Sequence, residues 1–126
     1  MVGRFDLHLH TRFSDGQGEV EDKAKKALEM GLDLMAITDH FGEHLDYRMN
    51  LEELQELHAI IKGQNYPIPV LLGIETGIEG TVPPELWGKV VLIIRSIHYL
   101  RQPVQAKSPF DPLYWEAYKE EVDRKS

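Results

Sequence analysis

The sequence has no cysteine and no long apolar segment. Without Cys among its 126 residues, disulfides and thiolate-bound zinc are excluded, so any metal site must use histidine and carboxylate ligands. The longest aliphatic run, Val90 to Ile94, is five residues long, whereas a membrane-spanning helix needs about 20. The N-terminus carries no apolar signal segment. We therefore expect a soluble, cytoplasmic protein without a membrane partner.

Basic charge is also scarce. Fourteen Lys and Arg residues against 21 Asp and Glu residues leave a net charge of −7. A surface of this kind does not collect nucleic acid by charge alone, although bound divalent cations would reverse the sign inside a pocket. A glycine-rich phosphate loop is missing too, because Gly16-Gln17-Gly18 is too short to be one. The composition therefore argues against a nucleic-acid partner.

What the chain does contain is a regular alternation of strand-like and helix-like segments. Its length and its 42% hydrophobic content fit one small globular domain. The hydrophobic periods predict strands at 5–10, 32–38, 69–74 and 89–95, and helices at 19–30, 50–63 and 112–122. The last two strands are rich in Val, Ile and Leu, as strands covered on both faces are. This alternation predicts parallel βαβ units, in an open sheet or in part of a (β/α) barrel.

The helix predicted at 50–63 shows both a start signal and an inner stripe. Asn50 and Glu53 have the spacing of a capping box. The stripe consists of Leu51, Leu54, His58 and Ile61. A lone histidine on such a stripe is more often a packing residue than a ligand, so we assign His58 no ligand role.

Side chains able to bind metals lie at the carboxyl ends of all four predicted strands. They are His8, His10, His40, Glu75 and His98. Carboxyl ends of parallel strands form the edge at which (β/α) barrels assemble their active sites, which favours a barrel over an open sheet. Glu75 directly follows a buried apolar run, where a carboxylate is costly to bury unless it is paired or bound to a metal.

Four motifs, in this order, resemble the PHP (polymerase and histidinol phosphatase) family. They are DLHLHTRFSDG at 6–16, AITDH at 36–40, GIE at 73–75 and SIH at 96–98. The resemblance implies a distorted (β/α) barrel that binds two or three divalent ions and hydrolyses a phosphate ester. His and carboxylate ligands suit Zn, Mn or Fe better than Mg or Ca. A metal-activated water would then attack the phosphate, and no protein nucleophile is required.

The resemblance also implies a role for individual residues. The implied metal ligands are His8, His10, Asp15, His40, Glu75 and His98. The first two would share one ion, Glu75 would bridge it to a second ion that His98 also binds, and Asp15 with His40 would hold a third. Asp6 and Asp39 adjoin ligands and are expected to orient the imidazoles from behind. The candidates for holding the phosphate are Arg12, Arg95 and Arg101, because a guanidinium matches its geometry.

The sequence departs from the family pattern after the fourth motif. Complete members carry a further His and an Asp-x-His, and neither follows His98 here. A (β/α) barrel needs about 200 to 250 residues. We therefore expect residues 1–126 to form a single PHP-like domain, about half of the barrel, lacking its C-terminal part. The polypeptide is then the N-terminal part of a longer protein, a natural short form, or a chain whose missing half a second chain supplies. If residues 1–126 are the functional unit, open strand edges and an apolar sheet face favour a homo-oligomer.

Three functions fit this pattern. The leading hypothesis is an enzyme, a phosphatase that hydrolyses a small phosphomonoester as histidinol phosphatases do. The alternative is a PHP nuclease or phosphodiesterase acting on nucleic acid or nucleotides. The third is a catalytically incomplete PHP fragment that serves as a binding module, which the missing downstream ligands support.

A pair of histidine variants tests the ligand assignment. We expect His40→Ala to lower the number of metal ions per chain, measured by elemental analysis, without unfolding the protein. His58→Ala should leave the metal content unchanged, because a packing residue on a helix holds no ion. An unchanged metal count in His40→Ala would remove His40 from the site.

Overall fold

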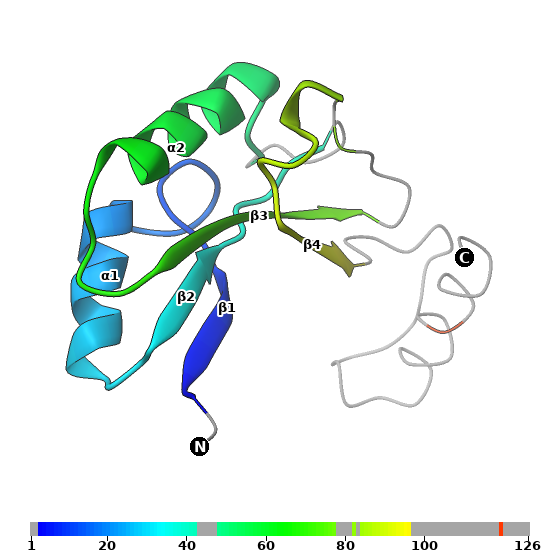
Figure 1. Ribbon diagram of the computed structural model, residues 1–126. Coiled ribbons are helices and arrows are strands. Elements are labelled where there is room, and N and C mark those ends of the chain that lie inside the picture. Colours follow the sequence, from blue (N-terminus) through cyan, green and yellow to red (C-terminus); the bar gives the residue numbers. More distant parts are fainter. Residues whose placement is uncertain (1–2, 43–47, 78–81, 83, 97–118, 120–126) are drawn as a thin grey trace.

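Parallel strands alternate with helices in the part of the chain that the structure, a computed structural model, describes: residues 3–42, 48–77, 82, 84–96 and 119. The elements are β1 (Phe5–Leu9), α1 (Val20–Glu29), β2 (Leu34–Ile37), α2 (Leu51–Gly63), β3 (Val70–Gly77), the 3₁₀ helix η1 (Pro84–Leu86) and β4 (Leu92–Ser96). The strands form one parallel sheet in the order β1-β2-β3-β4 (Figure 1). This strand order follows the sequence, as it does in one half of an eight-stranded (β/α) barrel. The predicted α/β class and partial barrel are therefore confirmed.

Both helices begin with reciprocal hydrogen bonds between a capping residue and the third helical residue. At α2, the Glu53 N–H donates to Asn50 Oδ1 at 2.8 Å, and the Asn50 N–H donates to Glu53 Oε1 at 3.2 Å, so the predicted capping box is confirmed. Glu19 and Asp22 form the same pair at α1. After α1, Gly31 has a φ of 76°, the left-handed conformation that ends many helices.

The inner stripe of α2 differs slightly from the prediction. Leu54 and Leu57 are its fully buried residues, whereas Leu51, His58 and Ile61 are partly buried. The stripe is therefore centred on Leu54 and Leu57, which follow each other at the i, i+3 spacing of one helical face.

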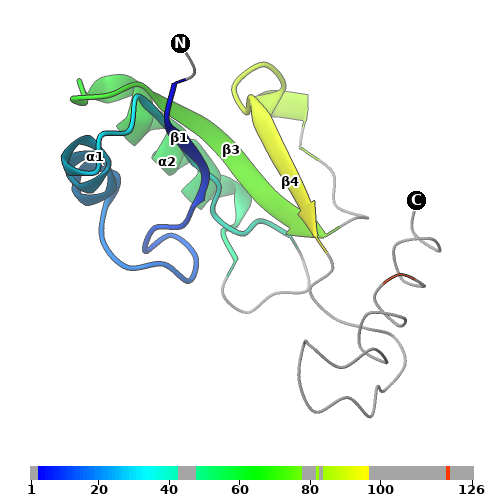
Figure 2. The same ribbon diagram turned by 90° about the horizontal axis from the view of Figure 1, so that it is seen from below.

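The core lies between the helices and one face of the sheet. Successive right-handed crossovers in a sequentially ordered sheet place their helices on the same side, as α1 and α2 lie in Figures 1 and 2. Met35 and Ile37 of β2 and Leu72 and Ile74 of β3 are buried on this side and cluster with Leu54 and other helix residues. The opposite face of the sheet is left for polar side chains near the strand ends.

A register shift in β1 decides which way its histidines point. Asp6 pairs with Met35, but the next pair along is Leu9 with Ile37, so three steps on β1 match two on β2. Within this shift, the N–H of His8 donates to Asp6 Oδ1 at 3.0 Å. Leu9 therefore shares the core face with Ile37, and His8 lies on the opposite face, because side chains alternate along a strand.

Two strand boundaries differ from the predictions by three residues, and the others differ by two residues or fewer. Glu75 was expected just past the third strand but lies inside β3, because the ladder with β4 continues through Glu75–Ile94 to Gly77–Ser96. The fourth strand begins at Leu92 rather than Lys89, because the Lys89 and Val90 N–H groups bond back to the Leu86 carbonyl in a turn.

The expectation that the fourth strand is covered on both faces is wrong. Alternate residues of β4, including Ile93 and Arg95, are exposed. The described helices pack chiefly against β2 and β3, which leaves one face of β4 in contact with solvent.

Some predictions fall outside the described residues. These include His98, Arg101 and the helix expected at 112–122, of which only Lys119 is described, as helical and exposed. None of the helices among the described residues has the length and apolarity to cross a membrane.

A pair of glycine variants tests the close packing of β3. A Cβ at Gly73 would lie 2.7 Å from the Leu92 carbonyl oxygen and 2.8 Å from Thr38 Cγ2, both nearer than real contacts allow. We expect Gly73→Ala to lower the free energy of unfolding in urea by about 1–3 kcal/mol. Gly63→Ala is the control, since nothing lies within 4 Å of its Cβ. Equal effects of the two variants would contradict the close approach.

Candidate metal centre

Five of the predicted site residues converge at the carboxyl edge of the sheet. They are His8, His10, Asp15, His40 and Glu75. They form two overlapping groups whose ligand atoms lie within 4.8 Å of one another. We call His8, His10 and Glu75 the first triad, and His10, Asp15 and His40 the second triad.

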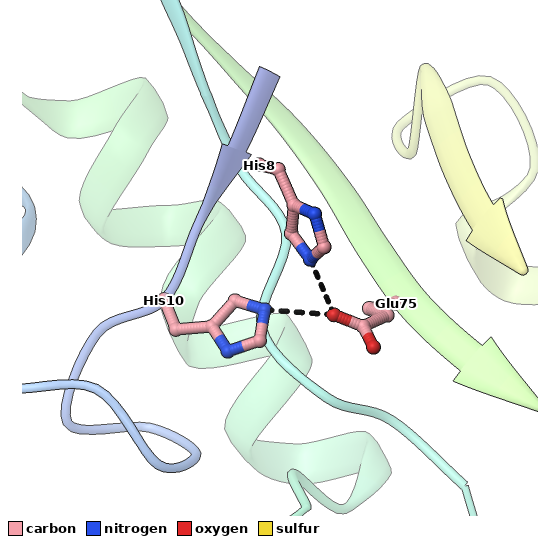
Figure 3. A group of neighbouring side chains, drawn as sticks. All are labelled: His8, His10 and Glu75. Carbon is pink, nitrogen blue, oxygen red and sulfur yellow. Dashed lines mark hydrogen bonds and ion pairs between the residues drawn. The ribbon is translucent and has the colours of Figure 1, made fainter. Parts of the chain in front are cut away.

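In the first triad, two imidazoles point at one carboxylate oxygen. His8 Nε2 lies 2.5 Å and His10 Nε2 lies 2.9 Å from Glu75 Oε1 (Figure 3). The histidines come from the end of β1 and the residue after it, and the carboxylate comes from β3, two strands away. The three side chains therefore meet across the intervening strand β2.

In the second triad, one carboxylate lies between two imidazoles. Asp15 Oδ1 is 2.7 Å from His10 Nδ1, and Asp15 Oδ2 is 3.3 Å from His40 Nε2. The rings of His10 and His40 meet edge to face with centroids 4.4 Å apart. His40 Nδ1 is also 3.6 Å from Glu75 Oε2, so the two triads touch at more than one point.

Backbone pairing beyond β2 holds His40 against Glu75. The Glu75 N–H donates to the Asp39 carbonyl at 3.0 Å, and the Phe41 N–H donates to the Glu75 carbonyl at 2.8 Å. These bonds make a parallel bridge between His40 and Glu75. The side chains of a bridged pair leave the sheet on the same face, which brings the two groups together.

The site combines burial with negative charge. The side chain of Glu75 is only 8% exposed, and its Oε2 accepts a hydrogen bond from Ser96 Oγ at 3.0 Å. At Asp15, burial alone would raise the pKa, but the hydrogen bond with His10 and the charges of His40 and His10 outweigh it and lower the pKa below its ordinary value. Asp15 is thus stabilised as a carboxylate.

The donor set fits a divalent cation. Both nitrogens of His10 face carboxylate oxygens, yet a neutral imidazole has only one N–H to donate. If Nδ1–H donates to Asp15, the lone pair of Nε2 faces Glu75 Oε1 together with His8 Nε2. A cation at that point would replace repulsion between lone pairs by coordination, and mixed His and carboxylate shells suit Zn, Mn or Fe.

Asp6 and Asp39 lie beside the triads, but their contacts are with backbone and hydroxyl groups. Asp6 accepts the N–H of His8, as described above. Asp39 is fully buried and accepts hydrogen bonds from Thr11 and Ser14. Their expected part in orienting imidazole rings remains a prediction.

Two of the three candidate phosphate-binding arginines lie in the described residues. The guanidinium of Arg12 pairs with Glu19, whose hydrogen bond raises the arginine's pKa, and it lies 4.5 Å from the centre of the Phe13 ring. Arg95 follows Ile94, the partner of Glu75 in the ladder, and so lies on the other face of the sheet from Glu75. Arg101, like the sixth implied ligand His98, lies outside the described residues.

Sequence reasoning missed three hydroxyl residues that contact the site. They are Thr11, Ser14 and Ser96. All three lie inside the family motifs, and this position was the one sequence feature that linked them to the site. A hydroxyl group in a loop is so common, however, that only its partner across the sheet shows what it does.

His58, which was assigned no ligand role, is not in either triad. It lies on α2, partly buried. Burial and the positive charges of Lys89 and Lys62 lower the pKa of its imidazole below the ordinary value. A neighbourhood of two lysines disfavours a further cation there.

The profile of the PHP domain family matches residues 6–125. The chain is 30% identical over 104 residues to the DNA polymerase/3'-5' exonuclease PolX of Bacillus subtilis, a match that covers 74% of this chain and 18% of PolX. It is 25% identical over 99 residues to a PolC-type DNA polymerase III of Latilactobacillus sakei, covering 77% of this chain and 6% of that protein. The chain therefore spans less than a fifth of either relative.

Among solved structures, the chain is similar to a histidinol phosphate phosphatase from Lactococcus lactis, crystallised with zinc, L-histidinol and phosphate. The TM-score is 0.49 and the sequence identity 22%, over 79% of this chain and 41% of the other.

The lowered pKa of His58 predicts how stability depends on pH. Because the folded state disfavours the imidazolium, the free energy of unfolding is highest above the ordinary pKa of about 6.5 and falls as the pH drops through the folded pKa. His58→Gln should weaken this loss in urea titrations between pH 7.5 and 5. An unchanged pH profile would show that His58 does not contribute to it.

Proposed function

The chain belongs to the PHP domain family, and on that premise we propose that it is a divalent-metal-dependent phosphoesterase. The observation that carries the proposal is the pair of triads, in which three imidazoles and two carboxylates converge at the carboxyl edge of a parallel sheet. Active sites of (β/α) barrels lie at this edge. The donor set is that of a catalytic metal site rather than of a surface ion pair.

We assign one ion to each triad. His8 Nε2, His10 Nε2 and Glu75 Oε1 would hold the first, and Asp15 Oδ2 with His40 Nε2 would hold the second. Ions so bound supply Lewis acidity, which activates a water and offsets charge on the phosphate. A further ion shared between Glu75 and His98 remains a prediction, as does the choice among Zn, Mn and Fe.

The residues of the chain orient this donor set. The contact of His10 Nδ1 with Asp15 directs the opposite nitrogen, Nε2, at the first triad. Ser96 Oγ holds the second oxygen of Glu75, which leaves the first oxygen aimed at His8 and His10. The low exposure of Glu75 and His40 reduces competition from water for the ions and the phosphate.

For the substrate, we propose a small phosphomonoester. The net charge of −7 provides no long-range attraction for a polyanion such as nucleic acid. Of the arginines considered for holding the phosphate, Arg12 would first have to leave Glu19, and Arg95 lies on the other face of the sheet from Glu75. A phosphate contact of Arg101 remains a prediction.

A second candidate is hydrolysis of a phosphodiester in DNA. The observation that favours it is the 30% identity with PolX, whose name includes a 3'-5' exonuclease. The same two triads could serve either reaction, because both transfer a phosphoryl group to water.

The assembly stays a proposal as well. We propose that residues 1–126 act as a single PHP-like domain in a homo-oligomer. Within the described sheet β1 and β4 are the outer strands, and Val91 and Ile93 are 60% and 40% exposed, which supports contact with a further copy.

Turnover of matched substrates tests the function. With Mn²⁺ added, we expect hydrolysis of p-nitrophenyl phosphate to exceed that of bis(p-nitrophenyl) phosphate and of single-stranded DNA, and EDTA should abolish it. Glu75→Gln should lower turnover about 100-fold or more and reduce bound metal, because it removes a charged ligand of the first triad. Glu85→Gln, at an exposed position in η1, is the control.

Three other outcomes would contradict the proposed phosphomonoesterase. Preferential hydrolysis of the diesters would favour the second candidate, hydrolysis of a phosphodiester in DNA. Absence of turnover on all three substrates with Mn²⁺ or Zn²⁺ bound would favour the catalytically incomplete binding module. Absence of bound metal would contradict the proposal itself.

A further inference from the structure

A buried carboxylate outside both triads has all its described hydrogen bonds with one loop. Asp39 has no exposed surface. Its Oδ1 accepts from the Thr11 N–H at 2.6 Å and from Ser14 Oγ at 2.6 Å, and its Oδ2 accepts from Thr11 Oγ1 at 2.7 Å. Burying a carboxylate is costly unless such donors compensate, so these three bonds hold the β1–α1 loop firmly.

The same loop carries Asp15, and its turn leaves little freedom between the anchored residues and that carboxylate. The N–H groups of Ser14 and Gly16 both donate to the Thr11 carbonyl, at 3.2 and 3.0 Å. A Cβ at Gly16 would lie 2.2 Å from the His10 carbonyl oxygen, so the chain folds tightly back upon itself here. Fixing Thr11 and Ser14 therefore fixes Asp15, which follows Ser14 directly.

The position of Asp39 in the chain links the loop to the rest of the site. It directly precedes His40, and its carbonyl accepts the Glu75 N–H at 3.0 Å. One residue thus touches the loop of Asp15 through its side chain and the strand of Glu75 through its backbone. Its side chain and its backbone therefore bind different parts of the site.

We infer that Asp39 is a positioning residue for the second triad, acting through Thr11 and Ser14 to hold Asp15 against His10 and His40. The inference rests on the proposed metal-dependent function. The three bonds of the Asp39 carboxylate go to Thr11 and Ser14, so their loss reaches the first triad through His10, which the two triads share. The expected result is a larger loss of affinity for the second ion than for the first.

Zn²⁺ titrations of the full chain, with a competing chelator, test this inference. Asp15→Asn first identifies the binding step that belongs to the second triad. The double variant Thr11→Val/Ser14→Ala removes both hydroxyl donors and keeps Asp39, which avoids emptying a buried site. We expect it to weaken that same step about 10- to 100-fold, the usual effect of losing groups that support a ligand, and to weaken the first step less.

Two further variants test the charge of Asp39 and separate positioning from general stability. Asp39→Asn removes the negative charge of the group that accepts from Thr11 and Ser14, so it should weaken the second step as the double variant does. Ile37→Val loosens the core at a fully buried position of β2 and removes none of the hydrogen bonds to Asp39, so both binding steps should persist. The ring nitrogens of His40, followed by NMR, report directly on the second triad.

The outcomes distinguish this inference from the proposed function. Wild-type protein that binds no Zn²⁺ overturns the proposed metal-dependent function. Wild-type protein that binds both ions, with equal affinity in Thr11→Val/Ser14→Ala, overturns the positioning role alone. Equal loss of the second step in Ile37→Val, or an unchanged second step in Asp39→Asn, also overturns it, because the effect would then follow stability rather than the hydrogen bonds of Asp39.

Discussion

Two imidazole nitrogens within 2.9 Å of a single oxygen of Glu75 set the conditions that the rest of the structure must meet. His8 and Glu75 come from strands separated by β2, so all three strands must be parallel, adjacent and in register. The carboxylate is nearly buried, and the free-energy cost of burying its charge is offset by partners on both of its oxygens. The packing of β3 between its neighbours is also close, because Gly73 of β3 leaves no room for a Cβ beside Leu92 and Thr38.

The two triads are not independent. His10 belongs to both, with one nitrogen facing each carboxylate, and His40 approaches both Asp15 and Glu75. A change at any of these groups therefore alters the donors seen by the other triad. Residues without ligand atoms take part as well, because Ser96 holds Glu75 and Asp39 holds the loop of Asp15. A metal centre of this kind is a network of hydrogen bonds as much as a set of ligands.

The fold was largely predictable because its signals are local. The capping box of α2, the end of α1 at Gly31 and the alternation of strands and helices all follow from neighbours in the chain. The extension of β3 through Glu75 and the late start of β4 were missed, since both depend on which residues the strands pair with. The register shift in β1 was missed for the same reason: it exists only relative to Met35 and Ile37 of β2.

The sequence by itself determined the chemical types at the site and their order along the chain, because histidines and acids that follow short apolar runs come to the same edge of a parallel sheet. It also determined, through the family motifs, which side chains to consider. Only the tertiary structure decided which atoms meet. His10 and Glu75 are 65 residues apart in the chain, and Thr11 and Asp39 are 28 apart. Contacts over such separations depend on strand register and loop closure, and neither has a local pattern from which it can be inferred.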